Sequence, residues 1–210
     1  MLEKIKVEYL SDRDIEKVTT ALLNKFGVFE TLPVPIEHIV DNKLALNVIP
    51  FPNLLNVFDT NSCISGDLSS LYVDEHLYTN LLLQFNFALA HELGHLFLHD
   101  RIYKKRPFST IEGYKMFIRD FDEAAYAAFE AQAHSFAGHF LVPGHHLEYH
   151  FEHERKGIDG FIKKIKDKAQ KIEIISTVMA QRLSPIFQVH ERPLKIRMER
   201  SQLIQKSFDL

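Results

Sequence analysis

The segment that decides the fold runs from Leu81 to Leu98 and reads LLLQFNFALAHELGHLFL. It is mostly apolar and long enough to predict a buried helix. Within it lies His91-Glu92-Leu93-Gly94-His95, an H-E-x-x-H pattern. Residues four apart share one face of a helix, so both imidazoles can reach one metal ion. The glutamate between them points about 100° away from His91, where it can accept a proton from a water activated by the metal.

Coincidence is the alternative explanation of this pattern. A chain with 12 His among 210 residues is expected to contain roughly 0.05 such patterns by chance. Imidazole and carboxylate groups are also seldom buried in a helix without a partner. The sequence therefore predicts a metal site with His91 and His95 as ligands and Glu92 as the general base.

A second helix, predicted from Asp122 to Leu141, offers the third ligand that a catalytic zinc requires. Phenylalanines place this helix in a core, where the acid Glu130 needs a partner. Small residues on the same face as Glu130, at Ala133 and Ala137, would let this helix approach Gly94 closely. We therefore expect Glu130 to complete the site, with one zinc ion per chain and manganese as the alternative.

The composition is that of a soluble globular protein. The hydrophobic fraction is 46% and the charged fraction 25%, both ordinary values. Polar residues interrupt the longest apolar run, which argues against a membrane span. The single cysteine, Cys63, excludes an intrachain disulfide and suits a reducing compartment. The start of the chain has no apolar signal-peptide core, so a cytoplasmic protein without a membrane partner is expected.

The net charge of −3 conceals an uneven distribution. Residues 161–206 carry 11 basic and 4 acidic residues, a balance of +7, whereas residues 1–160 have a balance of −9. We therefore predict two parts, a domain that carries the metal site over 1–145 and a basic helical segment over 146–210. A solvated basic face on a helical appendage explains the charge equally well.

The C-terminal segment has the outline of a helix-turn-helix. Apolar spacing predicts helices over Ile172–Leu183 and Glu191–Leu203, joined by a short turn. The second helix carries Arg192, Lys195, Arg197 and Arg200, which could dock nucleic acid or a partner protein. A lid or a substrate-docking element is the favoured interpretation, and DNA binding is the alternative.

The rest of the chain predicts further helices and a small sheet, hence an α+β fold. An amphipathic helix follows Ser11 or Asp12 and stops at Gly27. Strands are expected at Leu44–Phe51, around Ile64 and at Ser70–Asp74. The last is our candidate for an edge strand that takes up an extended substrate. Residues 101–120 are expected to form an exposed loop.

The motifs resemble those of the ImmA/IrrE metallopeptidases. The matching stretches are the run from His91 to His99, the run from Glu130 to Ala137, Leu141-Val142-Pro143, Pro33-Val34-Pro35-Ile36 and Phe87-Ala88-Leu89-Ala90. The resemblance covers roughly Ala21 to Pro143. It implies a minimal zincin fold, with His91, His95 and Glu130 as ligands and Glu92 as the base. It also implies a helix-turn-helix transcriptional repressor as substrate, often encoded on a mobile element.

The chain departs from the family's usual pattern at two places. His134 stands where members often have Asn, and Gln84-Phe85-Asn86 replaces an arginine-rich lead-in. These departures affect the surroundings of the metal rather than its ligands. Side chains expected around the ligands are His99, Tyr126, His134 and His139.

Three functions remain open at this stage. The first is a zinc endopeptidase that cleaves a repressor. The second is a DNA- or protein-binding regulator with a retained, non-proteolytic metal site, and the third is the peptidase-like partner of a toxin–antitoxin pair. Intact Glu92 favours the first, since a structural metal site needs no base. A further histidine set at His146, His150 and His153 has helical spacing, and a solvated helix face is its favoured interpretation.

Overall fold

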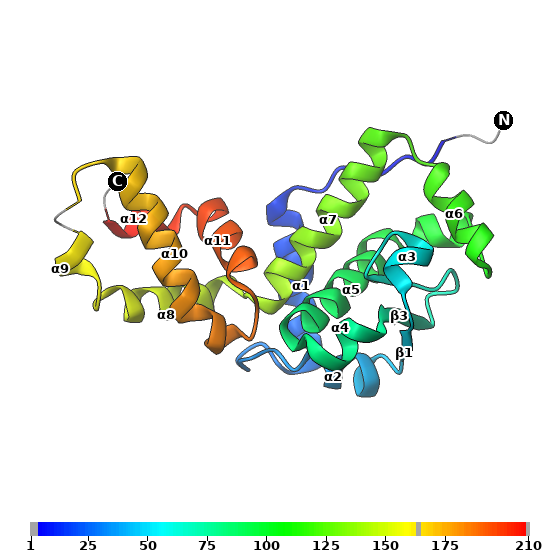
Figure 1. Ribbon diagram of the computed structural model, residues 1–210, viewed down its shortest axis with the longest axis horizontal. Helices are drawn as coiled ribbons and strands as arrows, with labels where there is room; N and C mark the ends of the chain where they lie inside the picture. Colours follow the sequence, from blue (N-terminus) through cyan, green and yellow to red (C-terminus); the bar gives the residue numbers. More distant parts are fainter. Residues whose placement is uncertain (1–3, 163–164, 209–210) are drawn as a thin grey trace. The chain divides into compact units, whose positions relative to one another are not determined.

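The computed structural model describes residues 4–162 and 165–208. These residues form two compact units. Unit 1 contains residues 4–29 and 35–140, and unit 2 contains residues 30–34 and 141–208. The described part is mostly helical with one small sheet, which is the α+β class that the sequence predicted (Figure 1).

The sheet of unit 1 has three short strands, β1 (Asn47–Phe51), β2 (Ser62–Ile64) and β3 (Ser70–Asp74). Their order is β1-β3-β2, with β1 parallel and β2 antiparallel to β3. The prediction of an edge strand at Ser70–Asp74 is therefore wrong. β3 is the central strand, because the short β2 folds back onto it through the turn at Ser65-Gly66-Asp67, and β2 itself is an edge.

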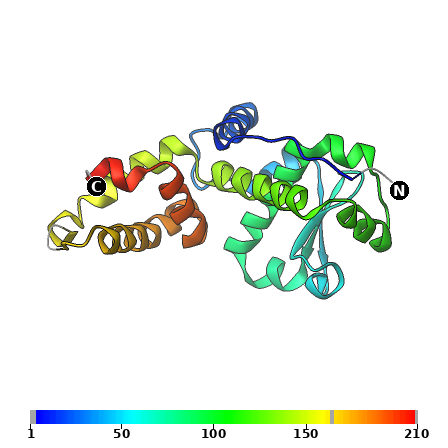
Figure 2. The ribbon, with the colours of Figure 1, turned by 90° about the horizontal axis from the view of Figure 1, so that it is seen from above.

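Helices make up the rest of unit 1 and pack beside the sheet (Figure 2). They are α1 (Asp12–Phe26), α2 (Ile36–His38), the π-helical turn η1 (Ile39–Lys43), α3 (Leu54–Phe58), α4 (Glu75–Asn80), α5 (Leu82–Lys105), α6 (Ile111–Arg119) and α7 (Glu123–Leu141). The predicted ends of the first helix are confirmed. The Ser11 side chain caps α1 by accepting from the Asp14 N–H, and Gly27 ends it at a φ of 74°.

Two segments near the motif helix differ from expectation. The chain breaks at Leu81, so that α4 and α5 are separate helices. The loop expected over 101–120 is partly helical, since α5 continues to Lys105 and α6 follows. Thr110 caps α6, and Tyr114 and Phe117 are buried, so its apolar face is part of the core.

The regular secondary structure in the described part of unit 2 is all helical. It contains α8 (Gly144–Arg155), α9 (Asp159–Ile162), α10 (Lys168–Phe187), α11 (Glu191–Arg200) and α12 (Leu203–Phe208). Gln188, with a φ of 50°, ends α10 in the left-handed region, and α11 packs back against α10. The contact buries Met179 and Leu183 of α10 with Leu194 and Met198 of α11. The predicted pair of helices is thus confirmed, except that the second helix ends at Arg200 rather than at Leu203.

Candidate metal centre

Gly94 marks the place where α5 and α7 come into close contact. A Cβ atom built on Gly94 would lie 2.9 Å from Cα of Ala133 and 3.1 Å from Cβ of Phe136. Only a residue without a side chain fits at this distance. The expectation that Gly94 and Ala133 bring the two helices together is confirmed. Each helix contributes candidate ligands on the face that meets the other.

Three side chains from these helices, those of His91, His95 and Glu130, form a small triangle. Nε2 of His91 and Nε2 of His95 are 3.1 Å apart. The Glu130 carboxylate oxygens lie 3.3 Å from Nε2 of His91 and 3.5 Å from Nε2 of His95. The structure therefore brings together the three ligands that the sequence predicted, two from α5 and one from α7.

The triangle has the size that a tetrahedral zinc site requires. Zinc binds histidine nitrogen and carboxylate oxygen at about 2.0 to 2.2 Å, so two of its ligand atoms lie about 3.3 Å apart. The separations of 3.1 Å between the two imidazole nitrogens, 3.3 Å from Oε2 of Glu130 to His91 and 3.5 Å from Oε1 of Glu130 to His95 bracket this value. The donor set of two imidazoles and one carboxylate is also one that catalytic zinc sites use. The residues present fit a divalent metal.

The electrostatic surroundings favour neutral His95. Burial and the neighbouring imidazoles of His91, His99 and His134 hold the pKa of His95 well below its ordinary value. Burial alone would lower the pKa of His91, but hydrogen bonding to Glu130 and the charges of Glu92 and Glu130 raise it above its ordinary value. A metal binds only the neutral imidazole, so binding would release a proton where His91 is charged.

Behind His95, a buried chain of hydrogen bonds extends away from the triangle. Nδ1 of His95 lies 3.1 Å from Nδ1 of His99, and Nε2 of His99 lies 3.0 Å from Oε1 of Gln132. The Gln132 amide then donates to the backbone oxygen of Glu8 at 2.8 Å. Burial lowers the pKa of His99 to about 4, so its ring is neutral near pH 7. His99 therefore lies where the sequence placed it, directly against a ligand.

Sequence reasoning missed Gln132 and Phe129. Gln132 is only 6% exposed, and nothing in the sequence distinguished it from a surface amide. The ring of Phe129 stacks on both His95 and His99, at centroid distances of 4.2 and 4.4 Å. It is one of the phenylalanines that predict a buried helix, but the sequence does not indicate its contact with the two histidines. Its place one residue before Glu130 is the signal that could have indicated this.

Glu92 lies beside the triangle and faces the edge strand. The Ser62 hydroxyl on β2 donates to Oε1 of Glu92 at 2.7 Å. Burial raises the pKa of Glu92, while the charge of His91 and hydrogen bonds from Ser62 and from the backbone of Ile64 oppose this rise. A buried carboxylate with a raised pKa is suited to accept and return a proton. Ser62 is a second residue that the sequence did not indicate.

His134 and Tyr126 flank the triangle on α7. The ring of His134 lies 4.5 Å from that of His91, centroid to centroid, and its Nδ1 is 3.0 Å from the backbone oxygen of Glu130. His91, Glu130 and His134 also place one ligand atom each within 4.8 Å of one another. Burial and the charge of Glu130 raise the pKa of Tyr126 to about 12, so its hydroxyl keeps its proton at neutral pH.

His139, the remaining candidate on α7, pairs with the first helix. Its Nε2 lies 3.0 Å from Asp12 and its Nδ1 lies 3.7 Å from Glu16, both on α1. The ring is only 3% exposed. These contacts give His139 a role in holding α1 against α7.

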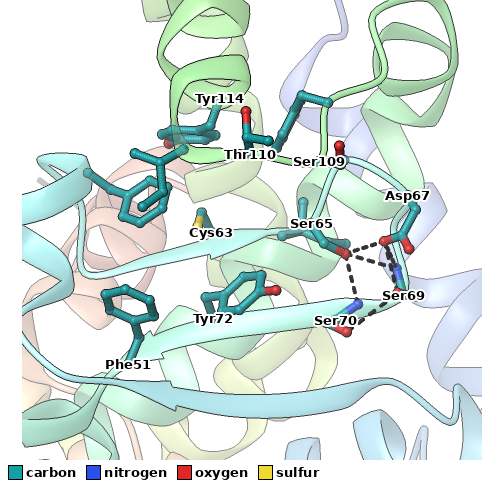
Figure 3. Close-up of a pocket in the computed structure, with 15 residues that line it drawn as sticks. Phe51, Cys63, Ser65, Asp67, Ser69, Ser70, Tyr72, Ser109, Thr110 and Tyr114 are labelled. Atoms are coloured by element: carbon teal, nitrogen blue, oxygen red, sulfur yellow. Dashed lines mark hydrogen bonds between the residues drawn. The ribbon is translucent and has the colours of Figure 1, made fainter.

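A cavity of about 310 Å³ lies on the other face of the same edge strand (Figure 3). Cys63 and Tyr72 are partners in the register of β2 and β3, and both line the cavity. Neighbouring residues of a strand point to opposite faces, so Ser62 faces Glu92 while Cys63 faces the cavity. The other aromatic lining residues are Phe51, Phe58, Phe108 and Tyr114.

The basic residues of α11 do not form one exposed surface. Arg197 is 5% exposed, and its Nε donates to the backbone oxygen of Val142 at 3.4 Å. The prediction of Arg197 as a residue that docks nucleic acid or a partner is therefore wrong, because its position on the helix faces the core of unit 2. Lys195 is half-buried and donates to Thr177 on α10. Arg192 and Arg200 are exposed.

No helix in the described residues has the length and apolarity needed to cross a membrane.

Comparison with curated proteins and with solved structures gave no match. The sequence profile of the M78 peptidases, described as the IrrE N-terminal-like domain, matches residues 78–184. This range includes α5 and α7 with all three candidate ligands. The chain therefore belongs to the M78 peptidase family of metal-dependent peptidases.

Proposed function

We propose that this chain is a zinc endopeptidase that cleaves a protein substrate with Glu92 as general base. The observation that carries the proposal is the triangle of His91, His95 and Glu130, whose separations suit a tetrahedral metal. Glu92 beside it supplies what a purely structural metal site does not need. Manganese is the alternative ion for the same donor set.

The residues around the triangle have separate tasks in this mechanism. A bound divalent metal would polarise the scissile carbonyl and lower the pKa of the attacking water. Glu92 takes the proton from that water and returns it to the leaving amine. The Ser62 hydroxyl holds Oε1 of Glu92 in place. His134 and Tyr126, which flank the triangle, are the candidates to donate a hydrogen bond to the developing oxyanion.

The free edge of β2 is our candidate for substrate binding. In the described part of the sheet, β2 pairs with β3 on one side only, and its Ser62 contacts Glu92. A substrate segment that adds to this edge would expose alternate side chains to the two faces of the sheet. The cavity beside Cys63, with its aromatic lining, would then accept a large apolar side chain. We propose a helix-turn-helix transcriptional repressor as the substrate, as the ImmA/IrrE resemblance implies.

The variant Glu92→Gln tests the mechanism. It keeps the size of the side chain and the metal ligands but removes the base, so we expect zinc binding within about twofold of wild type and cleavage reduced by at least about 10²-fold. A quenched-fluorophore peptide library, together with the helix-turn-helix protein encoded nearest to the chain, provides the substrates. Glu123→Gln, an exposed acid at the start of α7, is the matched control.

The result also separates the proposal from its alternative. Undiminished cleavage by Glu92→Gln would contradict the role of Glu92. If wild-type protein with zinc cleaves neither the library nor the repressor, and instead binds duplex DNA in a salt-sensitive way, the regulator with a non-proteolytic metal site becomes the better explanation.

A further inference from the structure

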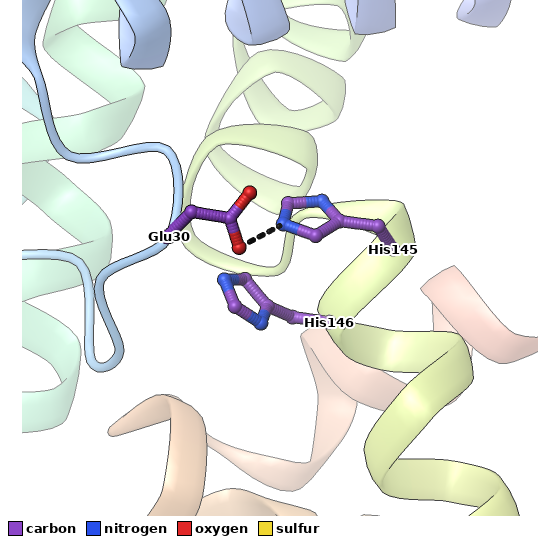
Figure 4. Close-up of side chains that lie close together, drawn as sticks. All are labelled: Glu30, His145 and His146. Atoms are coloured by element: carbon purple, nitrogen blue, oxygen red, sulfur yellow. Dashed lines mark ion pairs between the residues drawn. The ribbon is translucent and has the colours of Figure 1, made fainter.

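A second group of metal-binding side chains lies in unit 2, separate from the proposed peptidase centre. Glu30 belongs to segment Glu30–Val34, and His145 and His146 belong to the first turn of α8. One ligand atom from each of the three lies within 4.8 Å of the others. Figure 4 shows both imidazoles beside the Glu30 carboxylate. The proposed peptidase function assigns no task to these residues.

The distances indicate a site that is nearly assembled. Nε2 of His145 lies 3.8 Å from Oε2 of Glu30, and the rings of His145 and His146 are 4.0 Å apart, centroid to centroid. Ligand atoms of a tetrahedral zinc lie about 3.3 Å apart, so Oε2 of Glu30 would approach His145 by about 0.5 Å, and the ligand atom of His146, within 4.8 Å of the other two, would approach them by at most about 1.5 Å. Glu30, with a side chain 78% exposed, is free to make this adjustment.

The donors also match the chemistry of zinc. Two imidazoles and one carboxylate form a mixed nitrogen and oxygen set that zinc accepts readily, whereas magnesium and calcium prefer oxygen alone. Nε2 of His145 is shielded from solvent although the whole side chain is 35% exposed. Water at the surface would complete the coordination shell.

The other histidines of α8 have different partners. The ring of His150 lies 6.0 Å from that of Phe187, and Nδ1 of His153 lies 3.4 Å from Glu154. The helical spacing of His146, His150 and His153 is therefore not what brings ligands together here. The carboxylate comes from Glu30, more than a hundred residues earlier, which no local sequence pattern indicates.

We propose that Glu30, His145 and His146 form a second zinc site that ties segment Glu30–Val34 to the start of α8. The chain on both sides of this segment belongs to unit 1. Bringing Glu30 to the start of α8 closes a loop of more than a hundred residues, which costs conformational entropy. A metal that binds only this closed arrangement stabilises it. The role is structural, because it holds a connecting segment in unit 2.

The test uses the full chain with zinc as the only added ligand. The double variant His91→Ala/His95→Ala removes two ligands of the peptidase centre, and we expect equilibrium dialysis to find one zinc per chain remaining. Adding His145→Ala/His146→Ala should weaken this remaining binding by at least about tenfold. Adding Glu30→Gln, which leaves α8 unchanged, should also weaken it. Adding His150→Ala/His153→Ala instead is the matched control and should have no effect.

Two results would overturn the second site. One is a His91→Ala/His95→Ala protein that binds no zinc while circular dichroism shows it folded. The other is remaining zinc binding that is insensitive to both Glu30→Gln and His145→Ala/His146→Ala. A different result is expected if the peptidase centre binds no zinc. The wild-type chain then holds one zinc, which is lost on changing His145 and His146 but not on changing His91 and His95.

Discussion

In the row of hydrogen bonds behind the candidate metal centre, the protonation of His95 determines that of His99. If Nε2 of His95 binds a metal, its Nδ1 must carry the proton and donate to Nδ1 of His99. His99 must then carry its own proton on Nε2 and donate to Oε1 of Gln132. The amide of Gln132 is fixed in turn by the Glu8 backbone oxygen. A single arrangement of protons satisfies all these contacts, and it orients His95 for binding.

We therefore predict that Gln132→Ala weakens zinc binding although Gln132 does not touch the metal. Losing the acceptor leaves a buried N–H of His99 without its partner, and outer residues of this kind typically change metal affinity by about 10 to 100-fold. Competition with a fluorescent chelator measures the affinity. Gln181→Ala, on an exposed position of α10, is the control. Equal affinity in wild type and Gln132→Ala would contradict this role.

Sequence reasoning found the three side chains of the triangle but not the residues that support them. His91 and His95 follow from a spacing of four on one helix, and Glu130 follows from an acid on a helix whose phenylalanines place it in a core. Ser62 and Gln132 have no such signal, because their importance depends on which elements pack together. The prediction for Arg197 is wrong for the same reason. Its basic side chain suggested an exposed face, whereas it is buried against the backbone of Val142.

At the scale of elements, the site depends on how closely α5 and α7 approach. Glu130 lies one turn before Ala133, the residue that Gly94 contacts. Any separation of the helices at Gly94 would therefore move the carboxylate away from His91 and His95. The geometry of the triangle is thus set by a contact that contains no ligand.

We predict that Gly94→Ala both destabilises the protein and weakens metal binding. The added methyl would meet the backbone of Ala133 at 2.9 Å, and overpacking of this kind costs about 1 to 3 kcal/mol, partly offset by the better helix propensity of alanine. Urea unfolding and zinc titration measure the two effects. Gly160→Ala, where a Cβ meets nothing within 4 Å, is the control and should leave zinc affinity unchanged and stability equal or slightly higher. A Gly94→Ala protein with wild-type stability and affinity would refute the prediction.

The positions of the strands could be predicted from sequence, but their order in the sheet could not. The strands expected around Ile64 and at Ser70–Asp74 correspond to β2 and β3. Which strand lies at an edge depends on pairing between segments far apart in the chain, and β1 pairs with β3 rather than with β2. Local pattern does not contain that information, so the expected substrate edge was assigned to the wrong strand.

At the scale of the molecule, the family match crosses the division between the two units. It extends from Tyr78 to Ser184, whereas unit 2 resumes at Leu141. Helix α8 and most of α10 therefore belong to the pattern of the family. The family match therefore includes much of unit 2. The exposed basic residues of α11, Arg192 and Arg200, are too few to form a broad phosphate-binding face.

The location of the ligands predicts that metal removal acts unevenly on the chain. All three proposed ligands of the peptidase centre lie on α5 and α7 in unit 1, so we expect a bound ion to stabilise that unit. At a free zinc concentration 100 times the Kd, binding contributes about 2.7 kcal/mol to stability. The His145→Ala/His146→Ala protein isolates this effect from the second site. A chelator should lower its Tm by roughly 5 to 10 °C.

Hydrogen exchange locates the same effect within the molecule. With zinc removed from the His145→Ala/His146→Ala protein, amide protection should fall in α5 and α7 while α10 and α11 keep theirs, because local opening follows local stabilisation. Glu92→Gln in the same background should respond in the same way, since Glu92 is not a ligand. An equal loss of protection in α5 and α10, or none in either, would mean that the ion does not bind between α5 and α7.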